Sequence, residues 1–128
     1  GNQYERSLVM IKVVSTLKKR KEMSTENFCA YYERHHRLIG QKYLRGYATQ
    51  YIRRYLNPMI DIEGNLTQPQ FDVLLEIWFP DESTFVACSK RLNEPDVVRE
   101  IMDDEERLFD SGEKRSYIVE ECASLMDG

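Results

Sequence analysis

The sequence lacks the marks of a membrane protein, of a disulfide-bonded secreted domain and of a disordered chain. No apolar run reaches the ~18 residues that a membrane-spanning helix needs. Six Gly and four Pro among 128 residues, with 41% hydrophobic residues, exclude collagen-like and low-complexity chains. The three cysteines, Cys29, Cys88 and Cys122, are odd in number and widely spaced, so they fit neither a disulfide framework nor a zinc motif. We therefore expect reduced thiols and a cytoplasmic protein.

A strong excess of charge is also missing. The chain has 18 Lys and Arg against 22 Asp and Glu, a net charge of −4, which argues against nucleic acid and anionic membranes as partners. The basic run at residues 18–21 has no interleaved aromatic residues and indicates a solvated loop. Since the sequence has no Gly-rich phosphate loop and no metal-ligand triad, we expect neither nucleotide nor metal chemistry.

The length fits a single domain over residues 1–128. A chain of this size buries roughly 65–70% of its unfolded surface, which is enough for one core. Residues 1–7 are polar, and we expect no signal peptide there. Gly1 in place of an initiator Met resembles the remnant of a removed expression tag, so we expect residues 1–7 to form a flexible segment ahead of the fold.

A strand followed by an amphipathic helix opens the predicted fold. Residues 8–17 are rich in β-branched side chains and predict the strand. Ser24 is suited to cap the helix, and Gly40 to end it. Between them, large side chains recur at spacings of three and four: Phe28, Tyr32, His36 and Ile39. This stripe turns His36 inward and leaves His35, about 100° around the helix, at the surface.

Two further strands show an alternation of period two. In residues 44–56 three tyrosines fall on one face: Tyr47, Tyr51 and Tyr55. Residues 57–70 are expected to form a long loop. In residues 71–79 the odd positions are apolar, and two carboxylates and an indole share the other face: Asp72, Glu76 and Trp78.

The end of the chain predicts a two-part helix and a last strand. Asp81 can cap the first part, and Pro95 suits the first turn of the second. We assign the buried stripe of that second part to four residues: Val98, Ile101, Met102 and Phe109. Residues 114–121 complete a β-α-β order that occurs twice. This order predicts an α+β, ferredoxin-like fold with a four-stranded antiparallel sheet and helices on one face.

Such a sheet leaves its second face uncovered. Both sides of the first predicted strand are apolar, and a bare apolar face exceeds what monomers usually expose. A second copy packed sheet against sheet would cover it. We therefore expect a homodimer, a dimeric α/β barrel with the helices outside.

Several segments together resemble one known family. The run Ser24–Phe28, followed by Tyr32 and His36, resembles the first-helix signature of the EthD family. Residues 47–50 look like its Tyr-x-x-Gln segment, and residues 71–81 resemble its third strand. The resemblance covers nearly the whole chain and implies the dimeric α+β barrel. Relatives in the wider group include cofactor-free monooxygenases, lactone isomerases, polyketide dehydratases or decarboxylases, and haem-degrading enzymes.

Two residues are candidates for catalysis. His36 is inward-facing, and an imidazole moves protons near neutral pH. The alternative is a core histidine satisfied by one backbone carbonyl. Glu76 either pairs with an arginine, such as Arg53 or Arg45, or lines a cavity as an acid or base with a raised pKa.

Five residues are candidates for substrate binding: Tyr32, Tyr47, Trp78, Gln50 and Asp72. Phenols that reach a pocket would orient an oxygenated aromatic ligand, and Trp78 would close a flat pocket or fill the dimer seam. For Asp72, near the strand start, a turn hydrogen bond is the simpler interpretation. Gln50 enters through the resemblance alone.

The residues and the resemblance favour a cofactor-free enzyme acting on a small apolar or oxygenated aromatic molecule. His36 would drive a dehydration, isomerisation or decarboxylation. Two alternatives stay open. One is a catabolic oxidoreductase, either a monooxygenase whose substrate supplies the electrons or a protein that holds haem through His36. The other is a non-catalytic metabolite-binding module. We expect no cofactor, haem being the one exception, and no partner beyond a small ligand and a second copy.

Overall fold

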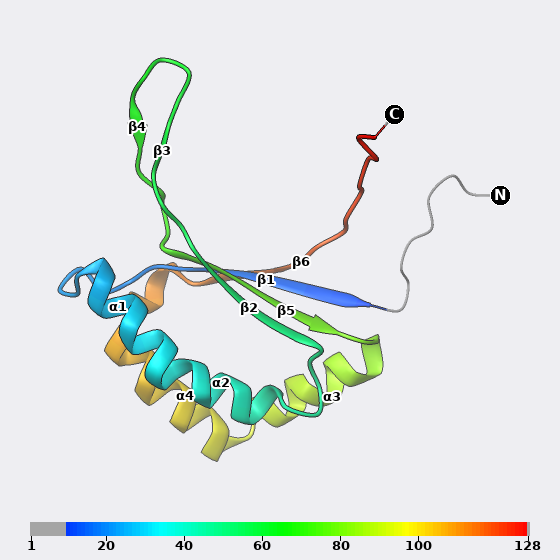
Figure 1. The fold of residues 1–128 in the computed structure, drawn as a ribbon. Coiled ribbons are helices and arrows are strands. Elements are labelled where there is room, and N and C mark those ends of the chain that lie inside the picture. Colours follow the sequence, from blue (N-terminus) through cyan, green and yellow to red (C-terminus); the bar gives the residue numbers. More distant parts are fainter. Residues whose placement is uncertain (1–9, 128) are drawn as a thin grey trace.

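A four-stranded antiparallel sheet with helices on one face forms the body of the molecule (Figure 1). The computed structural model describes residues 10–127. Its sheet strands are β1 Ile11–Leu17, β2 Gln50–Tyr55, β5 Val73–Phe79 and β6 Arg115–Ile118, in the order β2-β5-β1-β6. This is the ferredoxin-like order, so the predicted fold class is confirmed. The predicted start of the first strand at Leu8 and the expected flexibility of residues 1–7 lie outside the described residues.

The first group of helices is a continuous rod of three segments: α1 Thr25–Tyr31, the π-helical turn η1 Tyr32–His36 and α2 Arg37–Leu44. The predicted cap is confirmed, because Ser24 Oγ accepts a hydrogen bond from the Asn27 amide at 3.1 Å. The predicted stop at Gly40 is wrong, since the helix continues to Leu44. A Cβ at Gly40 would lie only 2.6 Å from Tyr51 Oη, so this glycine makes room for a strand side chain.

The second group of helices is α3 Glu82–Leu92 followed by α4 Pro95–Leu108. A short 3₁₀ turn, η2 Ser111–Glu113, precedes β6. Asp81 caps α3 as predicted, accepting from the Thr84 amide at 2.8 Å. The stripe assigned to the second part of the predicted helix is right for Phe109, which is buried, and wrong for Met102. Met102 is 54% exposed, and the fully buried positions are Val97, Asp104 and Leu108. Their spacings of seven and four define one helical face.

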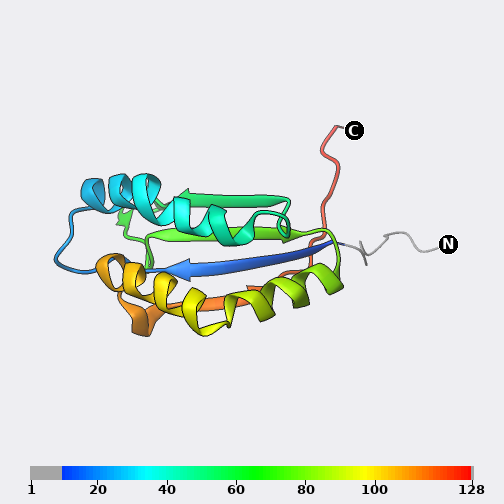
Figure 2. The same cartoon turned by 90° about the horizontal axis from the view of Figure 1, so that it is seen from below.

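Figure 2, seen from below, shows the helices over one face of the sheet, and the core lies between the helices and that face. Odd-numbered side chains of β1 and β5 point toward the helices, because successive strand residues alternate between faces. One buried cluster contains Leu17, Phe28, Tyr32, Val73, Leu108 and Phe109. A second contains Leu44, Phe79 and Cys88.

The second and the last of the predicted strands differ most from the observed limits. The strand expected over residues 44–56 begins only at Gln50, because α2 reaches Leu44 and a turn follows. Tyr47 therefore lies in that turn and does not share the strand face of Tyr51 and Tyr55. The last strand is limited to Arg115–Ile118.

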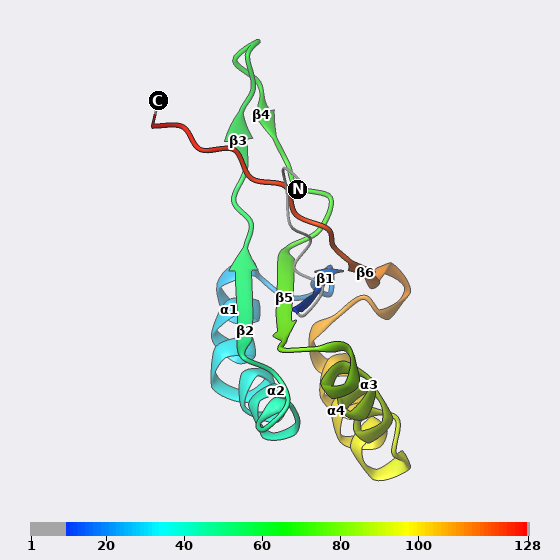
Figure 3. The ribbon, with the colours of Figure 1, turned by 90° about the vertical axis from the view of Figure 1, so that its right-hand side faces the viewer.

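The expected long loop contains a small two-stranded arm, β3 Met59–Ile60 and β4 Leu66–Thr67. The arm and the C-terminal segment both extend from the side of the sheet that carries no helices (Figure 3). Met59 and Ile62 of the arm are 78% and 103% exposed. The molecule thus presents apolar groups on its helix-free side.

Candidate active site

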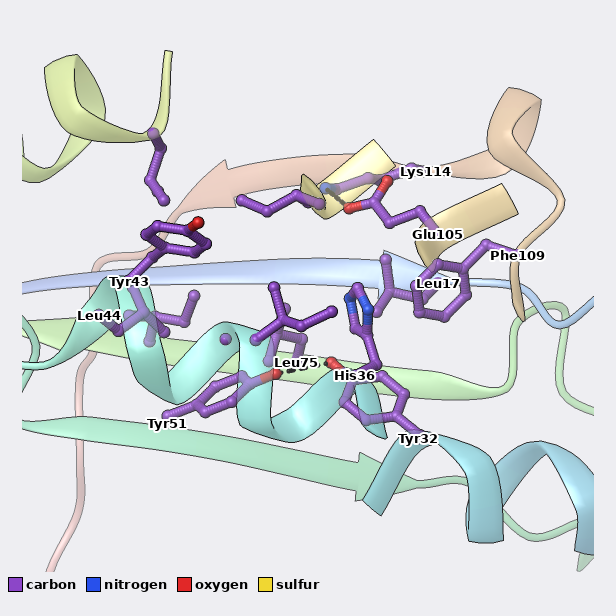
Figure 4. A pocket seen from close by; sticks show the side chains of 15 residues that line it. Leu17, Tyr32, His36, Tyr43, Leu44, Tyr51, Leu75, Glu105, Phe109 and Lys114 are labelled. Carbon is purple, nitrogen blue, oxygen red and sulfur yellow. Dashed lines mark hydrogen bonds and ion pairs between the residues drawn. The ribbon is translucent and has the colours of Figure 1, made fainter. Parts of the chain in front are cut away.

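A cavity of about 100 Å³ opens between the helices and the sheet (Figure 4). Its lining is mostly aliphatic and aromatic, and six of the lining residues carry polar atoms in the side chain: Tyr32, His36, Tyr43, Tyr51, Glu105 and Lys114. Apolar cavities of ~150 Å³ in proteins hold benzene. This cavity is smaller but partly open to the surface, so it suits a small molecule of up to about one six-membered ring, surrounded by apolar walls with a small number of polar groups.

A buried histidine–aspartate pair stands at this cavity. His36 Nδ1 lies 2.8 Å from Asp104 Oδ2, and the two residues are 7% and 4% exposed. His36 comes from η1 and Asp104 from α4, so the pair joins the two groups of helices. An ionised carboxylate accepts from the protonated Nδ1, which leaves the Nε2 lone pair of a neutral imidazole available. Nε2 has no hydrogen-bond partner among the described residues, and the histidine lines the cavity.

The carboxylate of Asp104 is held on both oxygens. Tyr31 Oη donates to Oδ1 at 2.5 Å, and Arg107 approaches the same oxygen at 3.5 Å. A buried carboxylate needs such partners, since leaving it without hydrogen bonds is costly. Asp104 is thus fixed in position and in turn fixes the orientation of the His36 ring.

The π-helical turn that carries His36 is anchored to β2. Arg53 binds Glu33 through two hydrogen bonds, of 2.9 and 2.7 Å, and Tyr55 Oη donates to the same carboxylate at 2.5 Å. The hydrogen bond from Arg53 is the main reason that the pKa of Glu33 is lowered. Isolated π-helical turns occur often at functional sites. This one holds Tyr32 and His36 edge-on to each other, with ring centroids 5.1 Å apart.

A pair of phenols adjoins the histidine. Tyr32 Oη and Tyr51 Oη are 3.1 Å apart, and both residues line the cavity (Figure 4). Burial is the largest cause that raises the pKa of both hydroxyls above the ordinary tyrosine value. Both phenols are therefore neutral hydrogen-bond donors at physiological pH.

An ion pair lies on the α4 side of the cavity. Lys114 Nζ is 3.3 Å from Glu105 Oε1, and the two side chains are 43% and 20% exposed. Because the pair is partly solvated, its attraction is weak. It places the most exposed polar groups of the lining on this side, away from the buried phenols.

The sheet separates two of the predicted site residues from His36. Glu76 and Trp78 share a face, as predicted, but that face is the helix-free one. The expectation that they complete the His36 pocket was wrong, because neither residue lines the cavity. Glu76 accepts from Arg54 at 2.5 Å, while Arg53, the partner suggested from sequence, faces the helices and binds Glu33.

The environment of Trp78 is distinctive on this second face. Lys12 Nζ lies 3.8 Å from the centroid of the indole ring, a cation–π arrangement. Its indole Nε1 is buried without a hydrogen-bond partner among the described residues. Gln50 is the direct cross-strand neighbour of Trp78 and is exposed, so it also lies outside the cavity.

The other two predicted binding residues are likewise outside the cavity. Tyr47 packs against the cluster around Leu44 and Phe79. Asp72 accepts a hydrogen bond from the Lys19 amide at 2.8 Å, which is the turn contact that was the simpler interpretation of this residue. Of the seven predicted site residues, the cavity therefore brings together Tyr32 and His36.

Asp104 and Tyr51 were not among the site residues predicted from the sequence, although both lie at the site. A signal for Asp104 exists in the spacing of Val97, Ile101, Asp104 and Leu108, which places a carboxylate on an apolar helix face. A buried carboxylate demands a partner, and an inward histidine elsewhere in the chain is an obvious one. Assigning Val98 and Met102 to the stripe, in place of Val97 and Asp104, concealed this.

Over residues 10–127 no group of three or more His, Cys, Asp or Glu side chains is arranged to hold a metal ion. Within the same residues, no helix combines the length and the apolar character needed to cross a membrane.

Residues 20–112 match the EthD domain, a region that spans well over half of the chain. The chain belongs to the EthD family. Among solved structures, it is similar to an EthD family protein of Bacillus halodurans, with a TM-score of 0.59 and 13% identity over 88% of this chain and 99% of that chain. A comparison with curated proteins gives no match.

Two further solved structures share the fold. An EthD-like protein of Ralstonia eutropha has a TM-score of 0.57 and 17% identity, covering 88% of each chain. A protein of Bacteroides fragilis, described as dimeric and of ferredoxin-like fold, has a TM-score of 0.54 and 11% identity over 87% of this chain and 95% of that chain. Identities this low show the common fold of the EthD domain and leave its chemistry to the residues of the site.

Proposed function

We propose that this EthD protein is a cofactor-free enzyme that moves a proton on a small, largely apolar, oxygenated molecule, with His36 as the general base or acid. The observation that carries the proposal is the buried hydrogen bond from His36 Nδ1 to Asp104. It sets the imidazole so that Nε2 is left for a ligand in the cavity. Proton transfer by a positioned imidazole typically accelerates a reaction by ~10²–10⁴ and needs no cofactor.

The surroundings of His36 support the same chemistry. Its ring is edge-on to Tyr32 and Phe109, with centroids 5.1 and 5.4 Å away, so it is fixed by aromatic walls. Apolar walls strengthen electrostatic interactions and exclude water. Dehydration, isomerisation and decarboxylation all include a proton transfer that one histidine can serve.

The test is deuterium incorporation. Small ketones, lactones and phenols are incubated in D₂O with the wild-type protein, and exchange or product is followed by proton NMR. Binding of each compound is recorded by saturation-transfer NMR in the same samples. Exchange that disappears in His36→Ala supports the enzyme. Compounds that bind without any exchange or conversion would overturn it in favour of a binding module.

We also propose that the protein forms a homodimer through the helix-free face. That face carries apolar side chains in every strand of the sheet: Val14, Ile52, Leu74 and Tyr117. Apolar groups spread over one face favour a partner of the same kind. The similar Bacteroides fragilis protein is described as dimeric. In such a dimer both cavities remain on the outer, helical side of the sheets.

A further inference from the structure

The hydroxyl groups of Tyr32 and Tyr51 form one hydrogen bond with each other at the cavity. One of their two hydrogens is not used in that bond. A phenol donates one hydrogen and accepts others. Between Tyr32 and Tyr51 one hydroxyl donates and the other accepts, at 3.1 Å. The accepting phenol keeps its own hydrogen, and neither oxygen has another hydrogen-bond partner among the described residues. Since both residues line the cavity, the spare hydrogen is available to a bound molecule whichever phenol carries it.

The fold holds this phenol pair in place. Tyr32 is 1% exposed and is surrounded by aromatic rings. Tyr51 lies against Gly40, where a Cβ would come within 2.7 Å of its ring carbons. The glycine thus gives space for the hydroxyl beside α2. A donor that is fixed before the ligand binds needs no reorganisation during reaction.

A cation strengthens the donor. The guanidinium of Arg53 lies 4.8 Å from the centroid of the Tyr51 ring, and its NH1 donates to the Tyr51 carbonyl at 3.0 Å. Positive charge near a phenol favours its donation of a hydrogen bond and the development of negative charge beyond it. Arg53 is itself fixed by Glu33, so the cation cannot swing away.

We infer that Tyr32 and Tyr51 form an oxyanion-binding pair, and that the substrate is a small carbonyl compound with an acidic C–H next to the carbonyl. This inference rests on the proposed function. His36 Nε2 takes the proton from carbon, so the C–H bond breaks and an N–H bond forms. The electron pair of that bond becomes the C=C bond of an enolate, and the carbonyl π electrons move to oxygen. The spare phenol hydrogen binds that oxygen, and return of the proton to carbon completes the cycle without an oxidant or reductant.

Binding of phenolates tests the pair without turnover. A phenolate mimics an enolate in shape and charge, and toluene has nearly the same shape without the oxygen. Fluorinated phenols of decreasing pKa are titrated calorimetrically, beside toluene. Affinity that increases as the phenol becomes more acidic, with weak binding of toluene, supports the oxyanion pair. Equal affinity for phenol and toluene, or no binding of any phenol at millimolar concentration, would overturn it.

Variants that lack the phenol oxygens test whether the hydroxyl groups of the pair bind the phenolate. The double variant Tyr32→Phe/Tyr51→Phe removes both phenol oxygens and should weaken the binding of the acidic phenols by ~10- to 100-fold, the value of a hydrogen bond to a charged group, with little change for toluene. Tyr117→Phe is the control, because Tyr117 is 56% exposed on the helix-free face of the sheet, outside the cavity. Unchanged phenolate binding in the double variant would contradict the inference, and a circular dichroism spectrum verifies that each variant is folded.

His36→Ala separates the two proposals. Phenolate binding that survives in this variant and is lost in the double variant Tyr32→Phe/Tyr51→Phe supports the oxyanion pair even where the wild-type protein shows no deuterium exchange. Loss of phenolate binding in His36→Ala alone would mean that an imidazolium holds the oxygen, and would overturn the role of the phenols while leaving proton transfer by His36 intact.

Discussion

His36 and Asp104 are 68 positions apart in the chain and meet through a hydrogen bond of 2.8 Å between Nδ1 and Oδ2. Each residue lies in the buried face of its own helix. The contact converts a core histidine into an oriented one, because the carboxylate determines which ring nitrogen carries the proton. A fixed tautomer is what a general base requires, and the proposed chemistry depends on it.

Asp104→Asn should reduce the rate of His36-dependent exchange by up to ~10⁴, since an amide no longer stabilises the imidazolium or selects the tautomer. The Asn side chain has nearly the same size, so the affinity for phenols should change much less than the rate. Rates by NMR and affinities by calorimetry separate the two quantities. A parallel loss of rate and affinity would show that Asp104 acts only on the shape of the cavity.

His36→Ala should abolish most proton exchange, by ~10²–10⁴, while the protein remains folded. His35→Ala is the matched control, because His35 is exposed and contacts Tyr31 at the surface, with ring centroids 4.7 Å apart. The measurement is the exchange rate of any compound that wild-type protein labels. Equal rates in the two variants would identify His36 as structural.

Gly40→Ala should destabilise the protein by ~1–3 kcal/mol, although alanine is usually the better helix former. The added Cβ would meet Tyr51 Oη at 2.6 Å and displace the ring. Gly112→Ala is the control, because the nearest atom to a Cβ there is 3.8 Å away. Urea unfolding measures both. A gain in stability for Gly40→Ala would show that Tyr51 moves aside easily.

Tyr117→Glu should shift the proposed dimer toward monomer. Tyr117 is 56% exposed on β6 and belongs to the helix-free face, so a charge there would be buried between two sheets. Leu38→Glu is the control, since Leu38 is 51% exposed on α2, on the opposite side. Light scattering at micromolar concentration reads out the mass. A wild-type monomer would contradict the dimer directly.

Alkaline pH should destabilise the protein partly through Cys88. Burial raises the pKa of this thiol from 9.0 to about 11. Between these values the unfolded chain has lost a proton that the folded chain keeps, so the free energy of unfolding decreases as pH rises, by ~3 kcal/mol in total. Urea unfolding of the wild-type protein and of Cys88→Ala at several pH values measures the contribution of this thiol to the pH dependence of stability. An identical pH dependence in the variant would contradict it.

Local patterns in the sequence predicted the parts of the fold that depend on neighbouring residues. Ser24 and Asp81 cap their helices, because a short polar side chain reaches an amide two or three residues ahead wherever it stands. The alternation in β5 placed Glu76 and Trp78 on one face and Val73 and Phe79 on the other, since side chains of a strand alternate.

The same local information misled where a residue serves a distant partner. Glycine is typical of a helix end, but Gly40 lies inside the helix, where Tyr51 occupies the space that a Cβ would take. Glu76 and Trp78 have the chemistry of a pocket, but they face away from the helices. Periodicity indicates which side chains share a face and gives no information on what that face meets.

The sequence alone therefore determined the order of the elements, the ferredoxin-like fold and the inward direction of His36, because caps, alternation and helical spacing act over a few residues. Only the tertiary structure decided that His36 meets Asp104 and that Tyr32 meets Tyr51 beside the same cavity. Those contacts depend on how α4 and β2 pack against one helical turn. Packing is a property of the whole core, and no short stretch of sequence contains it.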